Sequence, residues 1–172
     1  MGYSGGMTDA TGLDDDELSA WRSFVEMHHL LERHLVKHLQ RDFGLSDSDF
    51  EILVNLSEAP GGRLRAFELG RATQWEKSRM SHHLGRMEKR GLITKEVSDA
   101  RYPDVVLTDA GRAAIAASAP ANAARVRELF VEVVGPERLA VLKAASDDVL
   151  AALTEHVDAC ASSRKDAQHA DD

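Results

Sequence analysis

Residues that can bind a nucleic acid are concentrated in the stretch from Glu76 to Gly111. Met80, Leu84 and Met87 recur at i, i+4 and i+7, which predicts a helix with one apolar face. The opposite face is basic and hydrogen-bonding. Arginine can read guanine edges in a DNA major groove, while serine and lysine mostly hold phosphates. The candidate contacts of this recognition helix are Lys77, Ser78, Arg79, Ser81, His82 and Arg86.

A predicted hairpin follows this helix. Gly91 supplies the left-handed position that stops a helix, and two β-prone runs, 92–97 and 105–107, flank a loop at 98–103. We expect Arg101 in that loop to enter a minor groove, where narrow A·T-rich segments attract guanidinium groups. Asp99 could hold Arg101 by a bidentate pair. An ordinary surface ion pair is the alternative for these two residues. A helix sized for the major groove beside an arginine-bearing hairpin indicates a winged helix-turn-helix.

The charge of the chain is unevenly distributed. From Arg63 to Arg101 there are ten Lys/Arg and five Asp/Glu, a net charge of +5, whereas the remainder carries eleven against twenty-four, a net charge of −13. Attraction to phosphates is a local field effect, so the basic segment matters more than the total of −8. Double-stranded DNA is therefore the expected partner.

The elements around this segment predict a mainly helical fold. An apolar stripe from Leu18 to Leu39 predicts a first helix of about 27 residues, about 40 Å long. Phe67 and Leu69 are expected to point inward from a short third helix. The other helices are expected at 46–59, 76–90, 109–133 and from 136 to about 160, with a possible third strand at 63–65. The expected class is six helices with a two- to three-stranded wing.

The first, fifth and sixth helices are too long for one small winged domain to cover, so we expect an intertwined helical dimer. The expected organisation is a disordered extension at 1–13, a dimerisation helix at 14–45, the winged domain at 46–108, two dimerisation helices at 109–160 and a disordered tail at 161–172. Met7 could be the natural start, with an expression scar before it.

Several classes of protein fit the sequence poorly. No apolar run approaches the roughly 18 residues that span a bilayer, and no signal peptide is evident. The single cysteine excludes an intramolecular disulfide framework. The chain lacks G-x-x-x-x-G-K, G-x-G-x-x-G and H-E-x-x-H motifs. We expect a cytoplasmic protein without enzymatic activity, membrane contact, cofactor or resident metal.

The run DARYPDVVLTDAG resembles the wing signature D-x-R-x-x-x-V-x-L-T-x-x-G of the multiple antibiotic resistance regulator (MarR) family. The signature falls on Asp99, Arg101, Val105, Leu107, Thr108 and Gly111. Upstream, KSRMSHHLGRMEKRGLI looks like that family's recognition helix, and the resemblance spans about 18–160. It implies a homodimeric transcription regulator, usually a repressor, that binds an inverted-repeat operator and is released by a small molecule or by oxidation.

The resemblance also implies an effector pocket between the winged and dimer regions, often for aromatic acids or phenols. The candidate residues, chosen as bulky or polar groups near that junction, are Trp21, His28, Phe50 and Trp75. Trp75 could equally be buried at its turn, and His83 leans toward the core side of its helix. The effector, the operator and the choice between repression and activation are not determined by the sequence.

Other chemistries stay open. His28 with Glu32, and His34 with His38, have the four-residue spacing of zinc ligands, although no third and fourth ligand is evident. Cys160 could be a redox switch, which requires a neighbour that lowers its pKa. The alternative function is a winged-helix protein–protein adaptor that no longer binds DNA. Salt dependence separates the two, because counterion release makes duplex binding fall steeply with salt.

Overall fold

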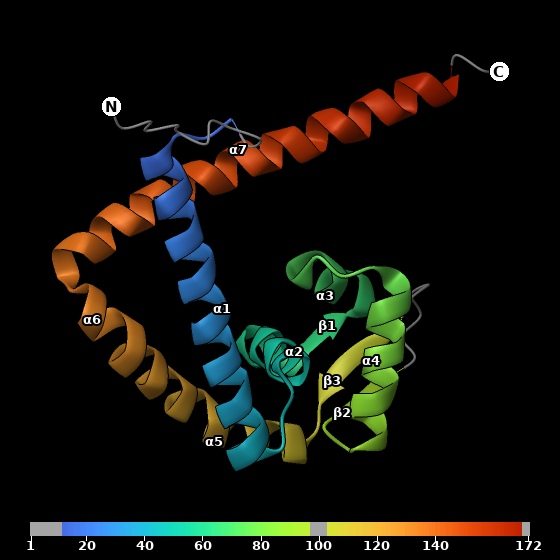
Figure 1. Ribbon diagram of the computed structural model, residues 1–172. Helices are drawn as coiled ribbons and strands as arrows, with labels where there is room; N and C mark the ends of the chain where they lie inside the picture. Colours follow the sequence, from blue (N-terminus) through green and yellow to red (C-terminus); the bar gives the residue numbers. More distant parts are fainter. Residues whose placement is uncertain (1–11, 97–102, 170–172) are drawn as a thin grey trace, which may run out of the picture. The chain divides into compact units, whose positions relative to one another are not determined.

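The computed structural model describes residues 12–96 and 103–169, with side chains described as far as residue 155. Helices dominate, and one small sheet lies among them (Figure 1). The order is α1 (Asp15–Phe43), α2 (Asp47–Glu58), the 3-10 turn η1 (Pro60–Gly62), β1 (Arg63–Arg65), α3 (Ala66–Thr73), α4 (Lys77–Lys89), β2 (Ile93–Glu96), β3 (Asp104–Leu107), α5 (Asp109–Val126), the π-helical turn η2 (Arg127–Val131), α6 (Glu132–Val134) and α7 (Pro136–His169). The predicted mainly helical class is confirmed, and the predicted fifth helix corresponds to α5, η2 and α6 in succession.

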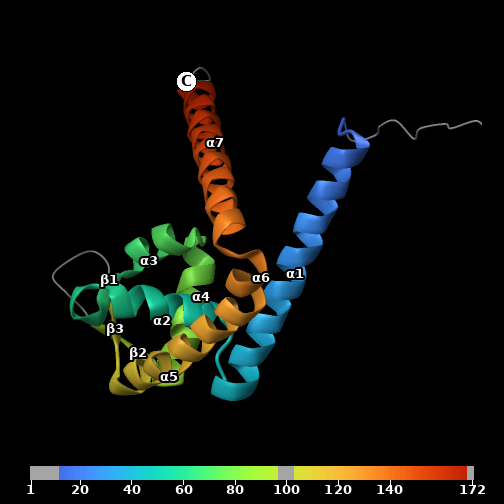
Figure 2. The ribbon, with the colours of Figure 1, turned by 90° about the vertical axis from the view of Figure 1, so that its left-hand side faces the viewer.

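The chain forms two compact units, one up to Arg125 and one from Val126 onward. The first unit contains α1 to α4, the sheet and nearly all of α5. The second contains η2, α6 and α7, and both ribbon views draw α7 as a single continuous helix (Figures 1 and 2).

Local side-chain contacts explain where α1 and α2 begin. Asp14 and Glu17 form a reciprocal capping box, with the Glu17 amide donating to Asp14 at 2.8 Å. Ser46 and Asp49 form the same box at the start of α2, with the Asp49 amide donating to the Ser46 hydroxyl at 3.1 Å. Each box satisfies amide groups that the first turn of a helix leaves unpaired.

The sheet is antiparallel with the strand order β1-β3-β2. Arg63 lies opposite Val106 on one side of β3, and Ile93 lies opposite Leu107 on the other. The possible third strand at 63–65 is therefore present as β1. Strand β3 is the central strand, paired with β1 on one side and with β2 on the other.

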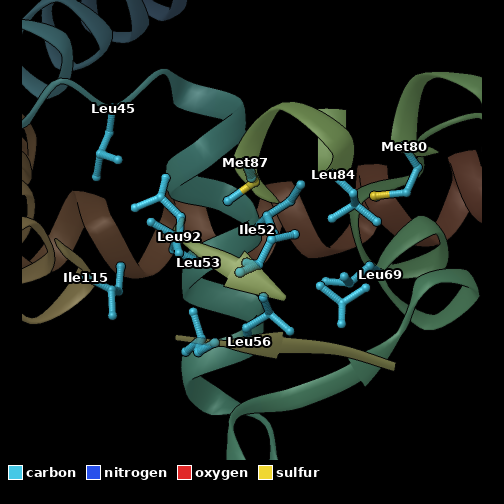
Figure 3. Packing of buried hydrophobic residues seen from close by; sticks show 13 residues of the cluster. Leu45, Ile52, Leu53, Leu56, Leu69, Met80, Leu84, Met87, Leu92 and Ile115 are labelled. Atoms are coloured by element: carbon cyan, nitrogen blue, oxygen red, sulfur yellow. The ribbon is translucent and has the colours of Figure 1, made fainter. Parts of the chain in front are cut away.

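The core joins helices to this sheet. Ile52, Leu53 and Leu56 of α2 are fully buried. They pack toward Leu84 and Met87 of α4, with Leu69 of α3 nearby (Figure 3). The apolar face of the recognition helix is thus fixed against α2 and the sheet, which leaves its other face outside.

Two details of the predicted organisation are wrong. Phe67 is 41% exposed, because it lies about 200° around the helix from buried Leu69, two residues later at 100° per residue. The last helix does not end near Cys160 but continues to His169. No glycine or proline interrupts 161–169, and arginine, lysine, alanine and glutamine there are good helix formers.

Candidate DNA-binding surface

Helix α4 divides cleanly into two faces. Met80, His83, Leu84 and Met87 are buried. All six predicted contacts are exposed: Lys77, Ser78, Arg79, Ser81, His82 and Arg86. The helix begins after a turn in which Gln74 adopts a left-handed φ of 55° and the Trp75 amide donates to the Gly70 carbonyl at 3.1 Å. This turn joins α3 to α4 in the manner of a helix-turn-helix motif.

Ion pairs tie the base of the hairpin to its neighbours. Arg63 Nη2 of β1 lies 3.2 Å from Glu96 Oε2 of β2, and Lys95 Nζ lies 3.2 Å from Glu88 Oε2 of α4. The predicted wing contacts Asp99 and Arg101 lie outside the described residues, so their contact with DNA stays a prediction.

Thr108 and Gly111 of the wing signature hold the start of α5. The Thr108 hydroxyl donates to the Gly91 carbonyl at 2.6 Å and accepts from the Gly111 amide at 3.0 Å. The Thr108 amide donates to the Leu92 carbonyl at 3.3 Å. Thr108 therefore joins the segment that follows α4, at Gly91 and Leu92, to the first turn of α5.

A buried carboxylate that the sequence analysis did not single out lies beneath α4. Asp49 Oδ2 accepts from Arg90 Nη1 at 2.6 Å and from the Ser46 amide at 2.9 Å. Arg90 Nη2 also donates to the Gly44 carbonyl at 2.7 Å. Burial acts to raise the pKa of Asp49, but hydrogen bonds from Ser46 and Arg90 outweigh it and hold the pKa below its ordinary value. The S-x-x-D cap at Ser46 was the signal available in the sequence.

His83 lies between this carboxylate and the exposed face. Its Nε2 is 3.1 Å from Asp49 Oδ1, and its Nδ1 is 2.6 Å from Arg86 Nη2. Burial lowers the pKa of His83; Asp49 opposes this effect, and the positive charges of Arg86 and Arg79 add to it. The expectation that His83 leans toward the core agrees with its burial.

Trp75 packs beside His83 rather than at a separate site. The two rings meet edge to face with centroids 5.4 Å apart, and Arg79 Cζ lies 4.1 Å from the centroid of the Trp75 ring. A guanidinium group over an indole face is held by the negative potential of the ring. Arg79 is therefore supported by Trp75.

The predicted effector residues lie on different elements. Trp21 and His28 are exposed on α1, Phe50 packs at the edge of the core in α2, and Trp75 lies at the turn before α4. Of these four, only Trp75 lines a hollow of about 520 Å³ bordered by α3, α4 and the sheet. Its lining includes Phe67, Met80 and Leu84 together with Arg71, Lys77 and Lys95.

The histidines of α1 make pairs rather than a cluster. His28 Nε2 lies 3.9 Å from Glu32 Oε2. His38 contacts Asp42, and its Nε2 is 2.8 Å from Arg125 Nη2. Among the residues that the structure describes, no three potential metal ligands converge. The side chain of Cys160 lies outside those residues.

No helix in the described part of the chain has the length and apolar character needed to cross a membrane.

The sequence and the fold resemble those of known transcriptional regulators. A model of the MarR family matches residues 43–101. AbsC, a MarR family transcriptional regulator from Streptomyces coelicolor, is 42% identical, with a TM-score of 0.79 over 83% of this chain and 97% of AbsC. Sco3205, a MarR family transcriptional regulator from the same organism solved in complex with DNA, is 35% identical, with a TM-score of 0.78 over 82% of this chain and 93% of Sco3205. No curated protein matches the sequence.

A more distant structure shares the fold. The organohalide-sensing regulator RdhR-CbdbA1625, in its 2,4-dichlorophenol-bound form, is 20% identical, with a TM-score of 0.69 over 87% of each chain. The match to AbsC, at 42% identity, extends over nearly all of that protein and over 83% of this chain. This chain belongs to the MarR family of transcriptional regulators.

Proposed function

We propose that this chain is a cytoplasmic, non-enzymatic repressor that binds an inverted-repeat DNA site as a homodimer. The observation that carries the proposal is the face of α4, where six polar and basic side chains are exposed on a helix whose other face is buried in the core. A helix of this kind enters the major groove, and its arginines reach base edges. The relative Sco3205 was solved with DNA.

Exposed apolar side chains favour the homodimer. In α1, Trp21 is 57% exposed, Phe24 49% and Leu30 54%. In α7, Val141, Val149 and Leu153 are also exposed. A monomer rarely leaves so much apolar surface in contact with water. In a two-fold dimer, two copies of α4 would meet successive major grooves about 10 base pairs apart.

A duplex titration at several salt concentrations tests this function. The probe is the DNA upstream of the chain's own coding sequence, with a scrambled duplex of equal length as the control. We expect tighter binding to the upstream duplex and a steep, linear fall of log K with log salt concentration. Equal affinity for both duplexes would argue against sequence specificity. Salt-independent binding, or none, would favour the protein–protein adaptor.

We further propose that an aromatic acid or phenol releases the DNA, acting through the hollow between α3, α4 and the sheet. Phe67, Trp75 and Met80 offer apolar surface there, and Arg71 and Lys95 offer positive charge for a carboxylate or phenolate. The hollow also borders Lys77 and Ser81, two of the predicted DNA contacts, so a ligand there shifts DNA affinity by its differential affinity for the free and the DNA-bound protein.

Competition measurements separate this effector from the other sensing chemistries. Phenolic acids, zinc, a chelator and peroxide are each added to the preformed DNA complex. If phenolic acids release the DNA and this release is weaker in Phe67→Ala, the result supports the hollow as the effector site. Release that vanishes in Cys160→Ser would assign redox sensing. A response to zinc or to the chelator would point to the histidine pairs of α1.

A further inference from the structure

A buried histidine bridges a buried carboxylate and an exposed arginine of the recognition helix. His83 is only 5% exposed. Its Nδ1 lies 2.6 Å from Arg86 Nη2, and its Nε2 lies 3.1 Å from Asp49 Oδ1. The three residues form a chain from α2, through the underside of α4, to the face of α4 that carries the predicted DNA contacts.

The chemistry of the partners fixes the proton on this imidazole. A guanidinium group only donates hydrogen bonds, so His83 Nδ1 must accept from Arg86 and cannot carry a proton. The proton of the neutral ring then lies on Nε2, facing Asp49, and an ionised carboxylate only accepts. The Nε2–H does not point straight at an acceptor, so its contact with Asp49 Oδ1 at 3.1 Å is mainly electrostatic.

We propose that His83 is a positioning residue for DNA recognition, held by Asp49 and acting through the hydrogen bond from Arg86 to its Nδ1. The inference rests on the proposed DNA-binding function and adds to it how the recognition face is organised. A free arginine side chain loses rotational freedom when it binds, and that loss weakens association. Holding Arg86 in advance reduces it.

The same packed group also supports a second arginine. The edge-to-face contact between Trp75 and His83 places the indole ring under Arg79. Arg79 and Arg86 are seven residues apart, which puts them on one face of the helix and about 10 Å apart along its axis. Asp49 additionally binds Arg90 at the end of α4. The buried Asp49 and His83, together with the partly buried Trp75, therefore order the cationic side of the helix.

Two conservative substitutions separate the contacts of His83. In His83→Asn the amide oxygen stands near the position of Nδ1 and can still accept from Arg86. In His83→Gln the amide stands near the position of Nε2, so the contact with Asp49 is kept and Arg86 has no acceptor there. Duplex affinity is measured for both variants in the wild-type and the Arg86→Ala background, and thermal unfolding confirms that each variant is folded.

We expect His83→Gln to weaken duplex binding by about threefold to tenfold, the size expected from freeing one long side chain. In the Arg86→Ala background, His83→Gln should cause no further loss of duplex affinity, because the effects of coupled residues are not additive. His83→Asn should retain most of the affinity. Equal losses from His83→Gln in both backgrounds, or equal losses from Asn and Gln, would overturn the inference.

A measurement without DNA tests the underlying hydrogen bond. Nitrogen-15 NMR of the full-length protein should show neutral His83 protonated on Nε2 and bare on Nδ1. The opposite tautomer would contradict the role of Nδ1 as the acceptor for Arg86. If the wild-type protein binds no duplex, both the proposed function and the proposed role of His83 are wrong. Additive losses in a protein that does bind DNA overturn only the role of His83.

Discussion

Gly111 in α5 lies so close to the carbonyl oxygen of Leu92 that a Cβ atom on Gly111 would stand 2.1 Å from that oxygen. The Thr108 amide and hydroxyl bind the carbonyls of Leu92 and Gly91, so the backbone there has little room to move away. The glycine of the wing signature is thus explained by close packing between the start of α5 and Leu92, in the short segment between α4 and β2.

Gly111→Ala should lower the free energy of unfolding by about 1–3 kcal/mol, the usual cost of forcing a methyl group into a packed site. Urea unfolding measures this change. Gly85→Ala is the matched control, because a Cβ at Gly85 meets nothing within 4 Å. Alanine in that helix interior should stabilise by about 0.5–1 kcal/mol. An unchanged stability in Gly111→Ala would mean that the two segments separate more easily than their contacts indicate.

The two faces of α4 were predictable because they depend on neighbours three and four residues away. Met80, Leu84 and Met87 mark the buried side by their spacing alone, and their burial leaves Arg79 and Arg86 exposed. Such features follow from the period of a helix or a strand, which a single sequence displays directly.

Asp49 was not predictable in the same way. An aspartate near a helix start is expected to be solvated, but here it is buried against Arg90, 41 residues later in the chain. The prediction for Phe67 was wrong in the opposite sense. Its apolar character indicates a buried position, but the buried residues of α3 are Leu69 and Thr73. Both depend on tertiary packing, which the composition of a short segment does not encode.

The stability of the protein should fall as the pH is lowered below about 6.5, the ordinary pKa of histidine. In the folded state the pKa of His83 is lowered, chiefly by burial, so the unfolded chain takes up a proton before the folded one. Asp49 adds a further loss below about pH 4, because its folded pKa is also lowered. Urea unfolding between pH 7 and pH 5 isolates the histidine contribution.

His83→Gln should flatten this pH dependence, whereas His82→Gln should preserve it. The two residues are adjacent, but His82 is exposed and His83 is buried. A pH dependence that survives in His83→Gln would assign the acid sensitivity to other groups.

Phe24→Glu should shift the protein from dimer to monomer. Phe24 stacks on Trp21 at the exposed surface of α1, with ring centroids 5.9 Å apart, and a buried unpaired carboxylate is costly at an interface. Sedimentation at micromolar concentration measures the change. Gln40→Glu introduces the same charge on the polar side of the same helix and should remain dimeric. A wild-type protein that sediments as a monomer would contradict the proposed assembly at the outset.

Substitutions of individual arginines should separate base reading from phosphate binding. Arg79 and Arg86 lie on the exposed face of α4. If either reads a base, its replacement by alanine should weaken binding by about 1–3 kcal/mol and relax preference at one position of each half-site. Arg101→Ala should instead relax preference at the flanks of the site, where a minor-groove arginine would read width. Replacing an arginine that only binds a phosphate should weaken binding to all duplexes alike and reduce the salt slope by about 1.

Arg41→Ala is the matched control for these three, because it removes an exposed arginine whose ion pair is with the adjacent Asp42 in α1. Each variant is titrated against the upstream duplex and against duplexes with single base changes. Loss of affinity in Arg41→Ala equal to that in the others would reflect total charge alone. If Arg79→Ala, Arg86→Ala and Arg101→Ala all bind as the wild type does, the DNA lies on a surface other than the exposed face of α4 and its neighbouring hairpin, even though residues 63–101 carry a net charge of +5.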